Sequence, residues 1–174
     1  MKNWKEITPA EMDKNPFTMF IDDWALLTVK KGDKVNSMTV SWGAVGYFWK
    51  EPCATVYPRP QRYTCELLRD ADSFSLSFFG PEKNCKDALT IMGRNSGRDM
   101  DKYAKAGLTV AYQDGVPFVE EADMVFLCEK RYMQLLDMNA VPEAQREQVR
   151  ETFYPTGDNH CLVIGRIKKI LREA

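Results

Sequence analysis

The sequence predicts a mainly β fold of the α+β class, with helices inserted between strands. Three observations support this prediction. Short runs of β-branched and aromatic residues alternate with small polar residues, a period of two that is typical of half-buried strands. The helical segments between these runs do not alternate with them as regularly as in a parallel βαβ sheet. No G-x-G-x-x-G motif follows a predicted strand, so the main signature of a Rossmann domain is absent.

The first two predicted strands cover Trp24–Lys30 and Ser37–Val45, with a glycine-containing turn at residues 31–34 between them. Alternation in the second strand separates a bulky face from a small, hydroxylated face. The bulky face carries Met38, Val40 and Trp42, and the small face carries Thr39, Ser41 and Gly43. We expect the bulky face to anchor the core. The small face either lies against a flat ring or simply meets water.

The remaining elements complete a chain in which strands dominate. The other predicted strands are Cys53–Tyr57, Ser73–Phe79, Thr109–Tyr112, Val116–Val119, Met124–Leu135 and His160–Leu171. Helices are predicted at Gln61–Asp70, Asn84–Met92, Asp99–Ala106 and Pro142–Thr152. Pro60 can open the first helix, Gly107 ends the third, and the fourth is charged and faces solvent. Because the sequence contains no repeat or Pro/Ser-rich linker, residues 1–174 are expected to form one domain.

Composition excludes several classes of protein. The 174 residues include 24 Lys and Arg against 25 Asp and Glu, so a net charge of −1 gives no global attraction to nucleic acid or an anionic membrane. Neither an apolar membrane span nor a signal core is present, which makes the cytoplasm the expected compartment. Five irregularly spaced cysteines and a single histidine, His160, argue against a disulfide framework, a metal site or a Ser-His-Asp triad.

Two segments place positive charge at the start of a predicted helix. The first, Y-P-R-P-Q-R-Y-T at 57–64, contains Arg59 and Arg62, which oppose the helix dipole unless an anion binds there. Phosphate is the natural candidate, because arginine grips its oxygens in a bidentate manner and Thr64 adds a hydroxyl donor. The alternative is that both arginines are solvated or paired with Glu66 and Asp70.

The second segment, R-N-S-G-R-D-M-D-K at 94–102, has a similar composition. Ser96 and Asp99 fit a capping box, Gly97 permits close approach of the backbone, and Arg98 and Lys102 add positive charge. The segment is therefore either a second phosphate cradle or an ordinary capped helix with surface charges.

Taken together, N-S-M-T-V-S-W-G, Y-P-R-P-Q-R-Y-T, S-F-S-L-S-F-F and S-G-R-D-M-D-K-Y, in this order, resemble the flavin reductase-like family of FMN-binding split β-barrel proteins, which includes flavoredoxin. The resemblance covers residues 23–107, with a weaker echo at 160–165. It implies a homodimeric, mostly antiparallel FMN-binding split β-barrel with inserted helices, in which the second subunit often helps to shape the pocket.

The resemblance also implies a role for each matching residue. The isoalloxazine and ribityl region would be lined by Asn36, Met38, Thr39, Ser41 and Trp42. The phosphate would be held by Arg59, Arg62, Tyr63 and Thr64, and then by Ser96, Arg98 and Lys102. Pro58 departs from the family pattern just before Arg59. Of the roles that the resemblance implies, that of Arg59 therefore rests on the poorest match, and the direction of its side chain is left open.

The expected function is that of an NAD(P)H-dependent flavin reductase in which hydride passes from NADH or NADPH to FMN, so that the flavin carries the chemistry. The alternatives are a flavoredoxin-like electron carrier reduced by a protein partner and a non-catalytic flavin-binding module. His160 is either a polar gate near the flavin or the start of a strand. The aromatic run Tyr47-Phe48-Trp49 either stacks on a flavin or nicotinamide, or makes core or dimer contacts.

Overall fold

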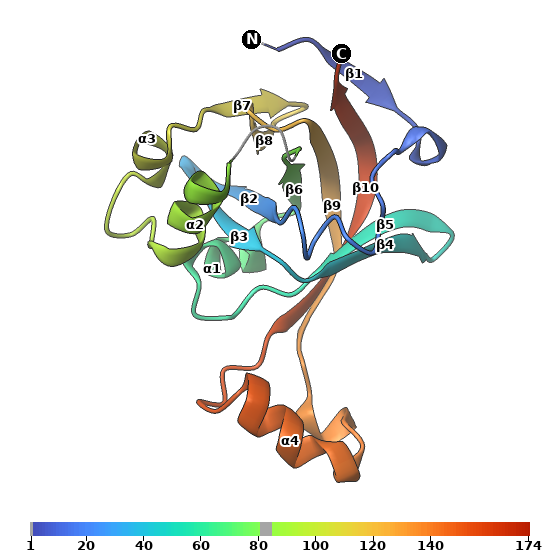
Figure 1. The fold of residues 1–174 in the computed structure, drawn as a ribbon, viewed down its shortest axis with the longest axis vertical. Helices are drawn as coiled ribbons and strands as arrows, with labels where there is room; N and C mark the ends of the chain where they lie inside the picture. Colours follow the sequence, from blue (N-terminus) through green and yellow to red (C-terminus); the bar gives the residue numbers. More distant parts are fainter. Residues whose placement is uncertain (1, 81–84) are drawn as a thin grey trace.

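The computed structural model describes residues 2–80 and 85–174, and its strands form a strongly curved antiparallel sheet flanked by helices (Figure 1). The strands are β1 (Trp4–Ile7), β2 (Ala25–Lys31), β3 (Lys34–Val40), β4 (Gly43–Phe48), β5 (Glu51–Val56), β6 (Ser73–Phe78), β7 (Val110–Gln113), β8 (Val116–Val119), β9 (Met124–Leu135) and β10 (Cys161–Glu173). The helices are α1 (Tyr63–Asp70), α2 (Lys86–Arg94), α3 (Lys102–Ala106) and α4 (Glu143–Phe153), with short 3₁₀ turns η1 (Pro9–Glu11) and η3 (Met138–Ala140).

The main sheet runs in the order β3-β2-β6-β9-β10-β5-β4, and β1 pairs with β10. All of these pairings are antiparallel, in agreement with the predicted fold class. Two register shifts between β9 and β10, at Ile164/Gly165 and Ile167/Lys169, increase the local twist and bend of this pair. At the first shift Gly165 lies against the ring of Phe74, where an added Cβ would come within 2.4 Å of the ring.

Apolar side chains fill both sides of this sheet. The larger cluster includes Leu27, Phe74, Phe78 and Phe126, all fully buried inside the curved sheet. A smaller cluster packs under α2, α3 and the separate β7–β8 hairpin, around Leu26 and Met92. The bulky face predicted for the second strand is confirmed for Met38 and Val40, which are 6% and 5% exposed.

The expected strand Ser37–Val45 is wrong as a single element. β3 ends at Val40 and β4 begins at Gly43, so Ser41 and Trp42 form the corner between two strands that lie at opposite ends of the sheet. Trp42 consequently leaves the core and is 41% exposed. Gly43 is required at this corner because the ring of Phe20 occupies the place of a Cβ, 2.4 Å from the added atom.

Helix boundaries differ from the predicted ones by one to three residues at their starts. α1 begins at Tyr63 because Gln61 and Arg62 remain in the turn after Pro60. α2 runs two residues beyond the expected Met92, and the predicted start of that helix, Asn84, lies outside the described residues. The sequence analysis predicts neither β1 nor η1. None of the helices in the described ranges is long and apolar enough to cross a membrane.

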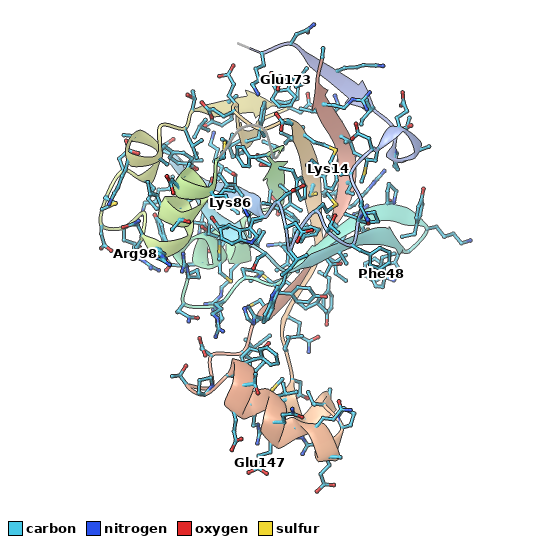
Figure 2. All side chains as sticks on the ribbon, in the orientation of Figure 1. Lys14, Phe48, Lys86, Arg98, Glu147 and Glu173 are labelled. Atoms are coloured by element: carbon cyan, nitrogen blue, oxygen red, sulfur yellow. The ribbon has the colours of Figure 1, made fainter. Side chains whose placement is uncertain are left out.

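Two parts of the chain project from the barrel. β9 and β10 continue past the sheet and carry residues 136–160, including α4, as an arm on which none of the residues of α4 is buried (Figure 1). The β4–β5 hairpin projects to one side, with Phe48 near its tip (Figure 2). At this tip Trp49 and Lys50 both have left-handed φ angles, 51° and 63°. The turn places two side chains where Asn-Gly is usual, a conformation that costs roughly 1–2 kcal/mol per residue.

Candidate functional site

A small cavity lies where the start of α1, the end of α2 and the loop before α3 meet the edge strand β3. Its volume is about 170 Å³. We call it the cationic cavity because four cationic side chains, those of Arg62, Arg94, Arg98 and Lys102, line it and no carboxylate does. The other lining residues are Asn36, Met38, Gln61, Tyr63, Thr64, Asn95, Ser96 and Gly97.

Two of these cations hold the carboxyl end of α2. The last carbonyls of a helix have no partner within it, so they need donors from elsewhere. Met92 O accepts from Lys102 Nζ at 3.0 Å, and Gly93 O accepts from the Arg62 guanidinium. Ile91 O accepts from the backbone and side-chain nitrogens of Asn95. Positive charge at this end also complements the helix dipole.

Lys102 is buried, with only 2% of its surface exposed. Its Nζ donates at 2.6 Å to Ser37 O, a carbonyl on the outer edge of β3, as well as to Met92 O. Burial, followed by repulsion from Arg62, lowers the pKa of Lys102 to about 8. Burial also lowers the pKa of Arg62. An anion bound nearby would therefore stabilise the charged forms of both side chains.

The other two cations lie at the rim of the cavity. The Arg98 guanidinium stacks on the Tyr63 ring, 4.7 Å from its centroid, and forms an ion pair with Glu66. The Arg94 side chain is exposed and forms no ion pair with any residue in the described ranges. Arg94 is therefore the cation whose charge is most available to a bound anion.

The start of α1 supplies neutral donors to the same cavity. Arg62 occupies the N-cap position, and no side chain caps the free N–H groups of the first turn. Asn36 Nδ2 donates at 2.8 Å to Thr64 Oγ1, which leaves the threonine hydroxyl proton free to donate elsewhere. Gly97 closes over Asn36 so tightly that a Cβ there would lie 2.1 Å from Asn36 Oδ1.

This donor set fits a phosphate group. It combines cations, a helix N-terminus and a hydroxyl, and it contains no competing carboxylate. The volume is below the roughly 300–1,000 Å³ usual for whole ligands, so the cavity suits one end of a larger molecule.

The structure brings together eight of the twelve residues expected at the site: Asn36, Met38, Arg62, Tyr63, Thr64, Ser96, Arg98 and Lys102. Thr39 lies outside the cationic cavity because its hydroxyl donates to Leu89 O in α2. Thr39, the one residue of the predicted small face that lies in β3, therefore packs against α2 and is half-buried. Ser41 and Trp42 line a different cavity.

Arg59 points away from the cationic cavity toward the base of the arm. It forms an ion pair with Asp158 and donates to Phe153 O at 3.1 Å. Gln61 also donates to Asp158, at 2.8 Å. The alternative in which Arg59 and Arg62 pair with Glu66 and Asp70 is wrong, since those carboxylates pair with Arg98 and Lys31.

The second cavity, which we call the aromatic cavity, has a volume of about 400 Å³. Its lining residues are Phe17, Phe20, Ile21, Ser41, Trp42, Gly43, Tyr57, Leu136 and Tyr154. The ring of His160 lies 5.0 Å from that of Trp42, and its Nδ1 lies 3.0 Å from the Tyr154 hydroxyl. Burial, followed by the positive charge of Arg59, lowers the pKa of His160, while Asp158 acts in the opposite direction.

Two sequence interpretations need correction at the cationic cavity. Ser96 and Asp99 do not form a capping box, because α3 begins at Lys102 and its N-cap is Asp101, whose carboxylate accepts from Ala104 N at 3.1 Å. Sequence reasoning also missed Gln61, Arg94 and Asn95 as lining residues. All three lie within the segments 57–64 and 94–102, but the predicted helix ends at Met92, two residues before the observed end of α2 at Arg94.

Comparison with known families identifies the class of protein. Residues 20–174 match the family described as flavin reductase like domain, so the chain belongs to that family. The fold is the split β-barrel of these proteins. No curated protein matches the chain significantly.

Solved structures show the same fold at low sequence identity. The FMN-binding domain of a flavin reductases-like enzyme from Shewanella baltica is 15% identical with a TM-score of 0.69, over 99% of this chain and 78% of that one. An FMN-binding protein from Thermus thermophilus, with bound p-hydroxybenzaldehyde, is 24% identical with a TM-score of 0.65, over 96% and 81%. Flavoredoxin from Methanosarcina acetivorans is 20% identical with a TM-score of 0.67, over 94% and 76%.

Replacing Lys102 with methionine is expected to destabilise the protein. The variant keeps the length of the side chain but leaves the buried carbonyls of Ser37 and Met92 without a donor, at a cost of about 1–3 kcal/mol for each. Urea denaturation of Lys102→Met measures this loss. Lys105→Met, an exposed change in the same helix, is the matched control. Equal stability of the two variants would contradict the role assigned to Lys102.

His160 is expected to titrate below the usual value of about 6.5 and to be neutral at pH 7, because burial and Arg59 disfavour the imidazolium. As the only histidine, it gives an unambiguous NMR titration. Arg59→Gln should raise its pKa, since the variant removes a nearby positive charge and frees the Asp158 carboxylate. Arg69→Gln, an exposed arginine in α1, should not. A wild-type pKa at or above 6.5 would be inconsistent with this arrangement.

Proposed function

We propose that this protein is an FMN-binding oxidoreductase, with NADH or NADPH as the reductant of the flavin. The observation that carries the proposal is the cationic cavity, in which four cations and the start of α1 surround a space with no carboxylate in its lining. Membership of the flavin reductase like family supports flavin as the ligand. The solved relatives include proteins described as FMN-binding and as flavoredoxin.

The residues of the cationic cavity would contribute to phosphate binding in three different ways. Lys102 and Arg62 stay bound to the carbonyls of β3 and α2 and provide a fixed positive field. Arg94 provides a mobile guanidinium suited to bidentate contact with phosphate oxygens. Thr64 and the free N–H groups at the start of α1 add neutral donors. A phosphate dianion in this place offsets charges that otherwise repel each other.

The corner at Ser41 and Trp42 connects β3, which borders the cationic cavity, to the aromatic cavity. We therefore assign the apolar ring end of the ligand to the aromatic cavity, which Trp42 lines. When bound, FMN supplies the redox chemistry, because its ring accepts a hydride from a reduced nicotinamide. Trp42 and Tyr154 line that region, and burial lowers the pKa of the nearby His160, which disfavours a positive charge beside the ring.

Loss of the Arg94 charge is expected to weaken FMN binding specifically. Arg94→Gln should raise the FMN dissociation constant about ten-fold or more, the usual effect of losing a hydrogen bond to a charged group. Riboflavin lacks the phosphate, so its affinity should change little. Arg69→Gln removes the same charge outside the cavity and serves as the control. Equal losses for FMN and riboflavin in Arg94→Gln would rule out the phosphate role.

FMN binding is also expected to weaken as the pH rises above about 8. The pKa of Lys102 is about 8 in the free protein, and a nearby phosphate raises it because it favours the ammonium form. Binding then takes up a proton above pH 8, so affinity falls with increasing pH there. Fluorescence titration from pH 7 to about 9.5, within that window, measures this, with riboflavin as a control that should show little dependence. A pH-independent preference for FMN would contradict it.

Anaerobic addition of NADH or NADPH tests the proposed reductant. A flavin reductase loaded with FMN should lose its flavin absorbance promptly with at least one of the two nucleotides. Persistence of the absorbance with both, followed by reduction with a redox protein, would instead identify an electron carrier of the flavoredoxin kind. Failure to bind FMN at all would overturn the proposed function.

A further inference from the structure

The arm, residues 136–160, is hydrogen-bonded to the barrel through the side chains of two residues. Within the described ranges, every side-chain hydrogen bond between the arm and the rest of the chain comes from Arg59 or Gln61. Both residues lie between β5 and α1, in a segment that we call the proline turn (residues 57–62). The base of the arm is therefore fastened to the segment that leads into the cationic cavity.

Asp158 is the centre of this attachment. Its carboxylate forms an ion pair with Arg59 and accepts from the Gln61 side chain at 2.8 Å and from the Thr156 hydroxyl at 2.7 Å. Hydrogen bonds from Thr156, Gln61 and Arg59 hold the pKa of this carboxyl well below its usual range. The carboxylate is thus ionised at neutral pH and keeps all three donors in place.

Arg59 also holds the carboxyl end of α4. Its guanidinium donates at 3.1 Å to Phe153 O, one of the last carbonyls of that helix, which have no partner within it. The same guanidinium lies over the Tyr154 ring, 5.8 Å from its centroid. Positive charge at this end complements the helix dipole. One arginine of the proline turn therefore contacts both α4 and the segment that follows it, and Asp158 fixes the direction of that arginine.

The proline turn connects these contacts to the cationic cavity. Its two prolines restrict the backbone φ angle, and Arg62 N donates to Arg59 O at 3.1 Å across the turn. Gln61 and Arg62 both line the cationic cavity. Because Gln61 reaches Asp158 as well as this cavity, a displacement of the arm moves part of the cavity lining.

We propose that Asp158 is a positioning residue for the cationic cavity, so that the arm and the anion site are coupled. By holding Arg59 and Gln61, it orients the proline turn. The turn in turn presents Arg62 and the free N–H groups of α1 to an anion. Linkage requires the reverse effect as well, so an anion bound in the cationic cavity orders the base of the arm. For the identity of that anion, the phosphate of FMN, this inference rests on the proposed function.

Asp158→Asn tests the positioning role with little change in the size of the side chain. It should raise the FMN dissociation constant about five-fold or more. Riboflavin affinity should change little, because the proline turn leads to the phosphate end of the site. Asp137→Asn is the matched control, since that carboxylate accepts from Asn139 N within the same arm. Circular dichroism checks that both variants fold.

The same variant distinguishes positioning from a direct contact between Arg59 and phosphate. Asp158→Asn leaves the Arg59 charge in place, so an arginine that binds phosphate directly would be released toward it. Unchanged or tighter FMN binding in Asp158→Asn would therefore overturn the proposal. Arg59→Gln should weaken FMN to a similar extent, and the double variant should bind about as well as the weaker single variant, because both changes break one contact. Fully additive losses would also overturn it.

Hydrogen exchange measured by NMR on the full chain tests the reverse effect. Inorganic phosphate is the probe, because it can enter the cationic cavity without a ring that reaches the aromatic cavity. Phosphate should slow exchange of the Tyr154 and Gly157 amides, which donate to Arg150 O and Tyr154 O. Chloride at equal ionic strength is the control, and Asp158→Asn should lose the response. Equal exchange with and without phosphate in wild type would overturn the coupling.

The two experiments separate this inference from the proposed function. If wild type bound no FMN, the proposed function would fail, and the exchange response to phosphate would still decide the coupling. If wild type bound FMN and Asp158→Asn bound it equally well, the coupling alone would fail.

Discussion

The contact on which the site depends is the buried ammonium of Lys102. It joins a carbonyl of the edge strand β3 to a carbonyl at the end of α2. Within the part of the chain that the structure describes, the other side-chain hydrogen bond between these two elements runs from the Thr39 hydroxyl to Leu89 O. Because the ammonium donates to both carbonyls, neither is left without a partner where α2 ends against the sheet. Arg62 extends the same arrangement to the next carbonyl. The positive charges of Lys102 and Arg62 in this region are therefore explained by the backbone carbonyls that they satisfy, without any ligand.

The same charges create the conditions for anion binding. Lys102 and Arg62 are close enough to repel each other, and burial lowers the pKa of both. Only Arg98 among the cavity cations has a carboxylate partner among the described residues, Glu66. A phosphate bound here, as proposed, would meet donors that the fold has already ordered, so binding would not have to arrange them. Arg94 is the fourth cation of the cavity and, unlike Arg98, has no carboxylate partner among the described residues.

The sequence predicted the β class and most strands because alternation is a local signal. Helix-start chemistry, also local, indicated five residues that share the cationic cavity: Arg62, Thr64, Ser96, Arg98 and Lys102. The family resemblance added Asn36, Met38 and Tyr63. The sequence did not predict that β3 and β4 separate at Ser41 and Trp42. That break depends on Phe20 occupying the space beside Gly43, a contact between residues 23 positions apart. Likewise, nothing local distinguishes Arg59 from Arg62. Asp158, almost a hundred residues later, draws Arg59 toward the arm.

The long strand β10 also governs when the fold can form. It pairs with β1, β5 and β9, and it comes after all the other strands in the chain. During synthesis, β5 and β9 therefore emerge from the ribosome long before the segment that joins them. Until residues 161–173 appear, the apolar faces of these strands lack their neighbour, and the nascent chain depends on delayed, long-range pairing that is intrinsically slow.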